Sequence, residues 1–424
     1  MQLNNKGLLI VLDGLGDHAI AAFDGQTPLE AANTPWLDNQ ARDGICGLVD
    51  PLIPGMPVDT HTGTGALLGS SPRDLYHLSR GPVEAAGTGI SIRPGNVALR
   101  CNFATLDADG ARILDRRAGR IQDGTGELAL ALNDIQIEQE ITATLNAATQ
   151  HRAVLVLSGP GLSADISDTD PGTGHLPARL RTSQPLRNND QEATRTAHAL
   201  NRFIGVAFDR LSDHPVNRRR IAKNQLPANG IITRGAGMSH RIENLIRHIG
   251  LKTAVISGER TVLGLARLLN FSAISDPSFT SLPDTNLEAK LGAARNAMKN
   301  HDLVMLHIKG TDICSHDLDP EGKKEFIERI DRSLQSLVSD ELVIGVSADH
   351  STDSNTGSHC GDPVPTLLNA PLGRKDSCTR FGESSCMNGG LGRISATAFI
   401  TSMLDAMGAL QNYRPADRRF FRTR

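Results

Sequence analysis

The sequence predicts an α/β protein with a mostly parallel sheet, interrupted by an inserted α/β domain. Short apolar runs fit buried strands, amphipathic helical patterns lie between them, and polar motifs follow several of the runs. Alternation of strands and amphipathic helices is typical of α/β folds. The chain has 424 residues, which leaves room for two or three domains of ordinary size.

The predicted strands are short, mostly apolar runs that lie far apart in the sequence. Runs without polar interruption are typical of strands that are buried on both faces of a parallel sheet. The runs are Leu8–Leu12, Ala153–Leu157, Thr253–Ile256, Leu303–Ile308 and Leu342–Val346. We therefore expect these segments to be strands of a mostly parallel sheet.

The clearest helical pattern runs from Lys323 to Val338. Its apolar residues recur at spacings of four, four and three, which places them on one face of a helix. They are Phe326, Ile330, Leu334 and Leu337. In a sheet covered by such helices, functional groups gather beyond the carboxyl ends of the strands.

Aspartate and histidine residues gather in short motifs near the two ends of the chain, several of them directly after a predicted strand. The residues are Asp13, Asp312, His316, Asp349, His350 and His359. Carboxylate oxygens mixed with imidazole nitrogens suit Mn²⁺, Zn²⁺ or Co²⁺. The set is larger than one such ion needs and suits two bridged ions, which clamp the oxygens of a phosphoryl group during displacement. The set therefore predicts phosphoryl chemistry on two metals.

Alternatives remain open for single members of this set. An aspartate at a strand end is often only a helix cap or a turn former. Asp317 and Asp319 could orient the ligands, but solvated loop charges are the simpler interpretation. The metal interpretation rests on all members together, because each lies at a strand end or in the loop beyond it.

Phosphoryl transfer also needs an acceptor, and the segment VDTHTGTGALLG supplies hydroxyl groups in a glycine-rich loop. Thr60 is the first candidate nucleophile and Thr62 the second, with Thr64 a further hydroxyl in the same loop. Coordination to a metal lowers the pKa of a hydroxyl and activates it. The alternative is a turn in which these hydroxyls satisfy local backbone donors.

The middle of the chain, residues 77–237, contains none of the proposed ligands but many arginines. We interpret it as an inserted substrate-binding domain that divides a metal-binding domain into residues 1–76 and 238–424. The arginines include Arg80, Arg100, Arg116, Arg117, Arg120, Arg218 and Arg234. The planar guanidinium group holds phosphate or carboxylate through two hydrogen bonds. Alternatively, any one of these arginines is a solvated surface residue.

Composition narrows the classes of partner. The formal net charge of −3 gives no reason to expect nucleic acid or a membrane surface as a partner. No apolar stretch approaches the roughly 20 residues that span a bilayer, and the N-terminus lacks the features of a signal peptide. The six cysteines lack CxxC pairs. We therefore expect free thiols in a cytoplasmic protein, with Cys314 and Cys360 as small packing residues.

With these motifs in place, the chain resembles the archaeal-type cofactor-independent (2,3-bisphosphoglycerate-independent) phosphoglycerate mutases of the alkaline phosphatase superfamily. The motifs extend over nearly the full length and include VLDGLGD, RGPVEAAGTGI, DRRAGRI, SDTDP, IKGTD, ADHST, HCGDPVP and GGLGRI. The resemblance implies an alkaline-phosphatase-like metal domain with an inserted phosphotransferase domain. It also implies a glycolytic isomerase that moves phosphate between the hydroxyls of 2- and 3-phosphoglycerate through a phosphoenzyme.

The resemblance assigns roles to individual positions of this chain. Asp13, Asp349 and His350 would hold one metal together with the nucleophile Thr60. Asp312, His316 and His359 would hold the other. The metals would be two divalent ions, Mn²⁺ first, with Zn²⁺, Co²⁺ or Mg²⁺ as alternatives. The substrate-binding arginines would be Arg116, Arg117, Arg120 and Arg234.

The chain departs from the family around the nucleophile. The family has a GSDTAH-like loop, so that Thr60 replaces serine, His61 replaces aspartate and Thr64 replaces histidine. The family's active-site lysine is replaced by Leu263, unless Arg260 takes its role. These changes leave two alternatives to the mutase: a phosphomonoesterase, and a mutase relative that acts on a phosphonate or another phosphorylated metabolite.

Overall fold

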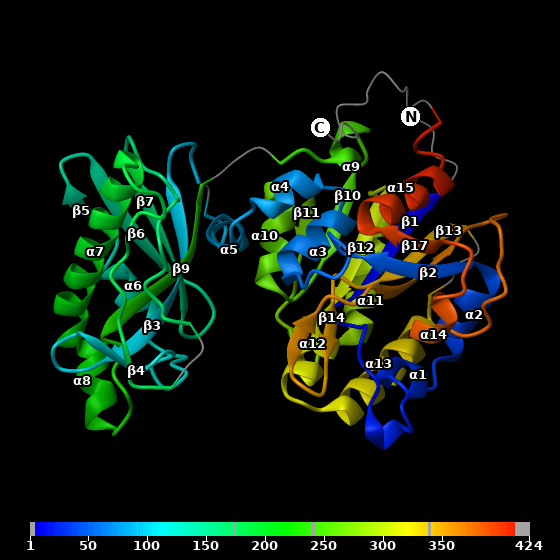
Figure 1. The fold of residues 1–424 in the computed structure, drawn as a ribbon, viewed down its shortest axis with the longest axis horizontal. Helices are drawn as coiled ribbons and strands as arrows, with labels where there is room; N and C mark the ends of the chain where they lie inside the picture. Colours follow the sequence, from blue (N-terminus) through cyan, green and yellow to red (C-terminus); the bar gives the residue numbers. More distant parts are fainter. Residues whose placement is uncertain (1–4, 91, 173–174, 239–241, 338–340, 412–424) are drawn as a thin grey trace. The chain divides into compact units, whose positions relative to one another are not determined.

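The computed structural model describes residues 5–90, 92–172, 175–238, 242–337 and 341–411. It divides the chain into two compact units (Figure 1). Unit 1 comprises Met1–His77 and Ile242–Arg424, and unit 2 comprises Leu78–Arg241. Unit 2 thus interrupts unit 1 in the sequence. Its role as a substrate-binding insert stays a prediction.

Unit 1 is built on an eight-stranded sheet with the order β11-β10-β12-β1-β13-β16-β2-β17. Its strands are β1 (Lys6–Leu12), β2 (Ile45–Asp50), β10 (Thr253–Ile256), β11 (Ser272–Ile274), β12 (Leu303–Ile308), β13 (Leu342–Ser347), β16 (Val364–Asn369) and β17 (Gly392–Ser395). Strand β16 pairs antiparallel with both of its neighbours, and the other pairs are parallel. The predicted mostly parallel sheet is therefore confirmed for this unit. A separate hairpin joins β14 (Ser351–Asp353) to β15 (Ser358–Cys360).

Helices flank this sheet (Figure 1). The longer ones are α2 (Pro35–Asp43), α3 (Thr60–Leu67), α10 (Arg260–Leu268), α11 (Leu287–Met298), α12 (Gly310–His316), α13 (Pro320–Leu334) and α15 (Ala396–Ala406). Short helices are η1 (Ala21–Phe23), α1 (Pro28–Ala31), α4 (Pro72–Tyr76), α9 (Leu245–His248) and α14 (Glu383–Cys386). Among the described residues, none of the helices has the length and apolar character needed to cross a membrane.

The helix expected from Lys323 to Val338 begins and ends earlier than predicted. Helix α13 begins at Pro320, because the Asp319 side chain caps the Gly322 amide and proline suits the first helical position. The helix ends at Leu334. Leu337 lies beyond this end but is still buried, so its apolar spacing indicated burial rather than helix. Val338 lies outside the described residues.

Unit 2 contains a seven-stranded sheet with the order β5-β6-β7-β3-β4-β8, and β9 pairs with β3. The strands are β3 (Val97–Leu106), β4 (Arg112–Asp115), β5 (Ile135–Glu138), β6 (Ile141–Ala147), β7 (Arg152–Ser158), β8 (Ala178–Arg179) and β9 (Gly230–Met238). Its helices are α5 (Arg80–Gly87), α6 (Thr125–Leu130), α7 (Gln191–Ser212) and α8 (Pro215–Ala222). The paired strands of this sheet are antiparallel.

The predicted strand Ala153–Leu157 therefore does not belong to a parallel sheet. It forms β7, which pairs antiparallel with β3 and β6. Leu155 packs in the large core of unit 2, whereas Val154 and Val156 pack on the other face with Ala85 of α5. Because both faces of β7 are covered, the run is apolar throughout. Such a run indicates burial on two faces but not the direction of the neighbouring strands.

Candidate active site

Three adjacent parallel strands of unit 1 bring the three proposed aspartate ligands to one edge of the sheet. Strand β1 lies between β12 and β13, and the three strands run in register. Asp13 directly follows β1, Asp349 lies just beyond β13, and Asp312 lies in α12 after β12. All three carboxylates have no exposed surface. Their convergence follows from the parallel order of the strands.

The proposed ligands form two groups in the structure. One group contains Asp13, Asp349 and His350, and the other contains Asp312, His316 and His359. Within each group, one nitrogen or oxygen atom per residue lies within 4.8 Å of the others. The rings of His350 and His359 stack with their centroids 3.7 Å apart, so the two groups adjoin.

The histidine rings are oriented by hydrogen bonds on the side away from the carboxylates. His316 Nδ1 lies 2.7 Å from the Gly357 carbonyl oxygen, and His359 Nδ1 lies 2.8 Å from that of Val58. Because a carbonyl accepts, each Nδ1 carries a proton, and Nε2 of each ring is the atom that faces the carboxylate. These Nε2 atoms lie 3.3 and 3.5 Å from Asp312. Such fixed tautomers are typical of metal-binding histidines.

Thr60 lies where the two groups meet. Its Oγ1 is 3.4 Å from His350 Nε2 and 3.1 Å from Lys309 Nζ. Thr64 Oγ1 lies 3.5 Å from Asp349 Oδ2. Thr62 is half-buried, and among the described residues its hydroxyl makes no hydrogen bond to the ligand groups. The geometry therefore favours Thr60 over Thr62 as the hydroxyl in the site.

The expected glycine-rich loop around Thr60 is in fact the helix α3. Glycine and threonine are weak helix formers, which is why the segment resembled a loop. The glycines are needed because the helix packs closely against the end of β13. A Cβ atom on Gly63 would lie 1.8 Å from the Asp349 carbonyl oxygen. Thr60 is the first residue of this helix, and its position is set by that close contact.

Lys309 is a site residue that the sequence analysis did not single out. Its Nζ lies 2.9 Å from Asp13 Oδ1 and 2.6 Å from Asp312 Oδ2. Leu263, where the resemblance predicted the loss of the family's lysine, is buried in α10, and Arg260 is exposed at the start of that helix. The positive charge beside Thr60 therefore comes from Lys309. In the sequence, the feature that could have identified Lys309 is the motif IKGTD, in which it stands three residues before Asp312.

His307 is a second residue that sequence reasoning missed. It lies within β12, fully buried, with Nε2 3.0 Å from Asp13 Oδ2. Its Nδ1 lies 3.1 Å from Ser257 Oγ, directly after β10. The ring therefore links two neighbouring strands and orients the Asp13 carboxylate. A histidine inside an otherwise apolar strand was the available signal.

The charges of the site keep Asp13 and Asp312 ionised. Burial opposes ionisation, but the Lys309 ammonium and the hydrogen bonds from neighbouring histidines together outweigh it and lower the pKa of both carboxyls below the usual range. Burial and the neighbouring Asp13 charge raise the pKa of Asp349. Burial lowers the pKa of His350, but Asp349 and Asp13 outweigh it and raise the pKa to about 9. Buried carboxylates this close together favour a cation between them.

A buried lysine fixes the loop that follows Asp13. Lys323 of α13 is fully buried, and its Nζ donates to Asp17 Oδ2 at 2.7 Å and to the Gly14 carbonyl at 2.8 Å. It also donates to the Thr352 carbonyl of β14 at 3.3 Å. This ammonium group therefore joins three segments that surround the aspartate and histidine ligands.

We expect Lys323→Met to lower the free energy of unfolding by about 3–5 kcal/mol, because it leaves the Asp17 carboxylate buried without its cation. Urea unfolding measures the change. The matched control is Lys324→Met, since Lys324 pairs with the exposed Glu321 and such pairs contribute at most about 1 kcal/mol. Equal stability of the two variants would contradict this role of Lys323.

In unit 2, the proposed substrate-binding arginines separate into two sets. The Arg116 guanidinium donates to the Asp170 carboxylate and to the Gly172 carbonyl. Arg234 Nη2 lies 2.7 Å from the second oxygen of Asp170. Asp170 is buried and therefore holds these two arginines together. It belongs to the motif SDTDP, in which the sequence alone indicated no role for this aspartate.

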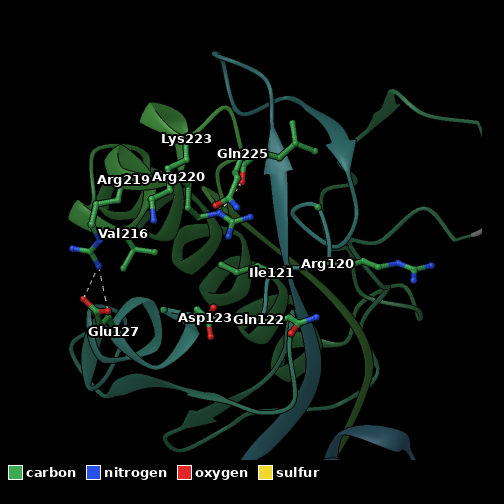
Figure 2. Close-up of a pocket in the computed structure, with 13 residues that line it drawn as sticks. Arg120, Ile121, Gln122, Asp123, Glu127, Val216, Arg219, Arg220, Lys223 and Gln225 are labelled. Carbon is green, nitrogen blue, oxygen red and sulfur yellow. Dashed lines mark hydrogen bonds and ion pairs between the residues drawn. The ribbon is translucent and has the colours of Figure 1, made fainter. Parts of the chain in front are cut away.

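Arg117 and Arg120 are exposed and lie outside this ion-pair cluster. Arg120 lines a cavity of about 560 Å³ in unit 2, together with Arg219, Arg220 and Lys223. Figure 2 shows its side chain extending away from Arg219 and Lys223. The structure thus brings Arg116 and Arg234 together, and does not join Arg117 or Arg120 to them.

Comparisons with known proteins agree with one another. A family model described as 2,3-bisphosphoglycerate-independent phosphoglycerate mutase matches residues 41–217. The 2,3-bisphosphoglycerate-independent phosphoglycerate mutase 1 of Methanothermobacter thermautotrophicus is 39% identical over 412 residues, which are 96% of this chain and 99% of that protein. The enzyme of the same name from Methanopyrus kandleri is 38% identical over 97% of this chain and 98% of its own length.

Two solved structures share the fold over nearly the full length. The PH0037 protein from Pyrococcus horikoshii has a TM-score of 0.80 and 32% identity, covering 96% of this chain and 98% of that one. The cofactor-independent phosphoglycerate mutase from Thermoplasma acidophilum has a TM-score of 0.68 and 34% identity, covering 95% of this chain and 100% of that one.

Proposed function

This chain belongs to the family of 2,3-bisphosphoglycerate-independent phosphoglycerate mutases, and we propose that it is an isomerase that interconverts 2- and 3-phosphoglycerate. The observation that carries the proposal is the position of Thr60, whose hydroxyl lies between two groups of carboxylate and imidazole donors. Its substrate is a small phosphorylated acid.

The donor set fits two divalent cations. Asp13, Asp349 and His350 would hold one ion, and Asp312, His316 and His359 the other. The Lys309 ammonium lies between Asp13 and Asp312, which supports the view that this space favours positive charge. Bound there, two divalent ions such as Mn²⁺ supply charge for the phosphoryl oxygens and lower the pKa of the Thr60 hydroxyl.

Thr60 and Lys309 then have separate roles in phosphoryl transfer. The Thr60 oxygen forms a bond to phosphorus while the bond from phosphorus to the glycerate oxygen breaks. The proton of the Thr60 hydroxyl ends on the departing glycerate oxygen. Lys309, 3.1 Å from Thr60 Oγ1, stabilises negative charge on the phosphoryl oxygens. Return of the phosphoryl group to the other hydroxyl of glycerate completes the isomerisation.

The arginines of unit 2 are the groups that we propose to bind the carboxylate of glycerate. Arg116 and Arg234, aligned by Asp170, present two guanidinium groups suited to a carboxylate. The exposed Arg117 follows Arg116 directly in the sequence. Retention of glycerate is what separates a mutase from a phosphatase, because glycerate that escapes leaves the phosphoenzyme to water.

We expect Arg117→Ala to shift the products from 2-phosphoglycerate towards free phosphate, because glycerate leaves before it is rephosphorylated. Parallel assays of 2-phosphoglycerate, coupled to enolase, and of free phosphate measure this ratio. Arg187→Ala is the control, since Arg187 is a largely exposed arginine of unit 2 that pairs with Asp165. If Arg117→Ala keeps the wild-type ratio, Arg117 does not hold glycerate.

A phosphomonoesterase is the second candidate function. The observation that favours it is Leu263, a buried aliphatic side chain at a position where the family has lysine. If Lys309 does not compensate for this loss of charge, water competes with glycerate for the phosphoenzyme. The two functions give different products from 3-phosphoglycerate: 2-phosphoglycerate from the mutase and free phosphate from the phosphomonoesterase.

A further inference from the structure

Three cysteines of unit 1 gather at a point that the proposed reaction does not use. Cys46 lies in β2, Cys378 in the irregular segment that follows β16, and Cys386 at the end of α14. All three are buried and reduced. The Cys46 thiol neighbours those of Cys386 and Cys378. Cys378 Sγ donates to the Ser385 carbonyl at 3.3 Å, and Cys386 Sγ donates to the Thr366 carbonyl at 3.8 Å. Because the cysteines come from separate segments, no CxxC motif reveals the cluster.

A carboxylate lies beside these thiols. Asp376, Cys46 and Cys378 offer ligand atoms that lie within 4.8 Å of one another. Asp376 Oδ2 accepts hydrogen bonds from the Cys46 and Gly390 amides, both at 2.7 Å. Its Oδ1 accepts one from the Cys378 amide at 2.8 Å. An ionised carboxylate has about four acceptor directions, so these three bonds fix its orientation and leave a direction for a further partner.

The backbone that follows Cys386 passes close to the backbone of Cys46. The turn after α14 passes directly over β2, where the Leu391 amide donates to the Cys46 carbonyl at 2.9 Å. A Cβ atom on Gly389 would lie 2.1 Å from that same carbonyl oxygen. Only glycine permits this approach. The turn thereby places Cys386, at the end of α14, beside strand β2.

We propose that Cys46, Cys378, Cys386 and Asp376 form a tetrahedral binding site for a thiophilic divalent metal ion, with Zn²⁺ as the preferred ion. Thiolates are soft ligands, and sulfur-rich tetrahedral sets select zinc. With Zn–S bonds of about 2.3 Å, neighbouring ligand atoms lie roughly 3.8 Å apart. The ligand atoms of Asp376, Cys46 and Cys378 lie within 4.8 Å of one another, so a bound ion would draw them closer together.

The metal site would stabilise an irregular segment by attaching it to the central sheet. Residues 370–382 contain no helix or strand, and long irregular segments are uncommon inside compact units. The metal joins this segment and α14 to β2 of the central sheet. Binding releases the thiol protons, because only thiolates coordinate. A disulfide would use two of the sulfur atoms and leave the third cysteine and Asp376 without a common function.

Cobalt(II) tests the proposal in the full-length protein, because sulfur and oxygen or nitrogen ligands give different spectra. Reduced, chelator-treated protein is titrated with Co²⁺ and then with Zn²⁺. We expect thiolate-to-cobalt charge-transfer absorption in the near ultraviolet, which Zn²⁺ abolishes by displacement. The aspartates and histidines around Thr60 include no sulfur and give no such band. Asp312→Asn should therefore keep the band, so this test is independent of the proposed mutase function.

Substitutions of single residues test whether the thiolate-to-cobalt absorption band arises from the proposed cysteine site. We expect Cys378→Ser to remove it and to weaken Zn²⁺ binding by more than about 100-fold, beyond the roughly 10- to 100-fold effect of losing an outer contact. Cys101→Ser is the control, because Cys101 is a buried cysteine of unit 2. If Cys378→Ser does not fold, Asp376→Asn, which keeps all three thiols, should alter the cobalt spectrum. A wild-type protein without a charge-transfer band, or a disulfide among these cysteines in the native protein, would overturn the proposal.

Discussion

Thr60→Ala is expected to abolish isomerisation and the covalent phosphoenzyme, with kcat falling by a factor on the order of 10⁴–10⁶, as for the loss of other enzymatic nucleophiles. The reason is that Thr60 Oγ1 is the hydroxyl in contact with both His350 and Lys309. Thr60→Ser should retain substantial activity, because serine presents the same hydroxyl. Labelling with phosphate from 3-phosphoglycerate, followed by mass analysis of the peptide, measures the phosphoenzyme.

Two neighbouring hydroxyls provide the controls for this experiment. Thr62→Ala should label normally, because among the described residues the half-buried Thr62 hydroxyl makes no hydrogen bond to either ligand group. Thr64→Ala should label as well, although Thr64 Oγ1 lies 3.5 Å from Asp349. If the label persists in Thr60→Ala and disappears in one of these variants, the nucleophile is that other threonine.

Asp312→Asn is expected to remove a metal ion together with the activity, and chelation of the wild-type enzyme should have the same effect on activity. The Asp312 carboxylate is fully buried and faces Lys309, His316 and His359. Asparagine keeps the volume but loses the charge that a divalent ion requires. Metal analysis and activity after addition of Mn²⁺, Co²⁺ or Zn²⁺ measure the effect. The fold should persist, because unit 1 keeps its sheet.

The control for this substitution is Asp317→Asn, an exposed aspartate at the end of the same helix. It should bind metal and react as the wild type does, because it lies outside both ligand groups among the described residues. Full activity of the wild-type enzyme in excess chelator, with no transition metal in the preparation, would contradict the metal assignment.

The sequence predicted the aspartates of the site from their positions after buried strands. Asp13, Asp312 and Asp349 each follow a buried strand, and the parallel order of β12, β1 and β13 brings them together. The sequence showed the strands but not their order. Lys309 and His307 were missed because their roles depend on register: β12 pairs with β1 so that both side chains reach Asp13.

The arginines of unit 2 show a second limit of sequence reasoning. The motif DRRAGR suggested one cluster, but its backbone turns sharply. Ala118 and Arg120 have φ angles of 46° and 55°, in the left-handed region, so consecutive side chains point in different directions. Arg116 reaches Asp170 whereas Arg120 does not. Similarly, Cys46 is far from Cys378 and Cys386 in the sequence, and the strand order of unit 1 brings it near them.

The products formed from 3-phosphoglycerate test the central claim most directly. The wild-type enzyme, supplied with Mn²⁺, is incubated with 3-phosphoglycerate, and 2-phosphoglycerate and free phosphate are measured in the same reaction. The account predicts that 2-phosphoglycerate forms as fast as 3-phosphoglycerate disappears before equilibrium, with little phosphate released. Release of phosphate as fast as 3-phosphoglycerate is consumed, without formation of 2-phosphoglycerate, would contradict the mutase and identify a phosphomonoesterase.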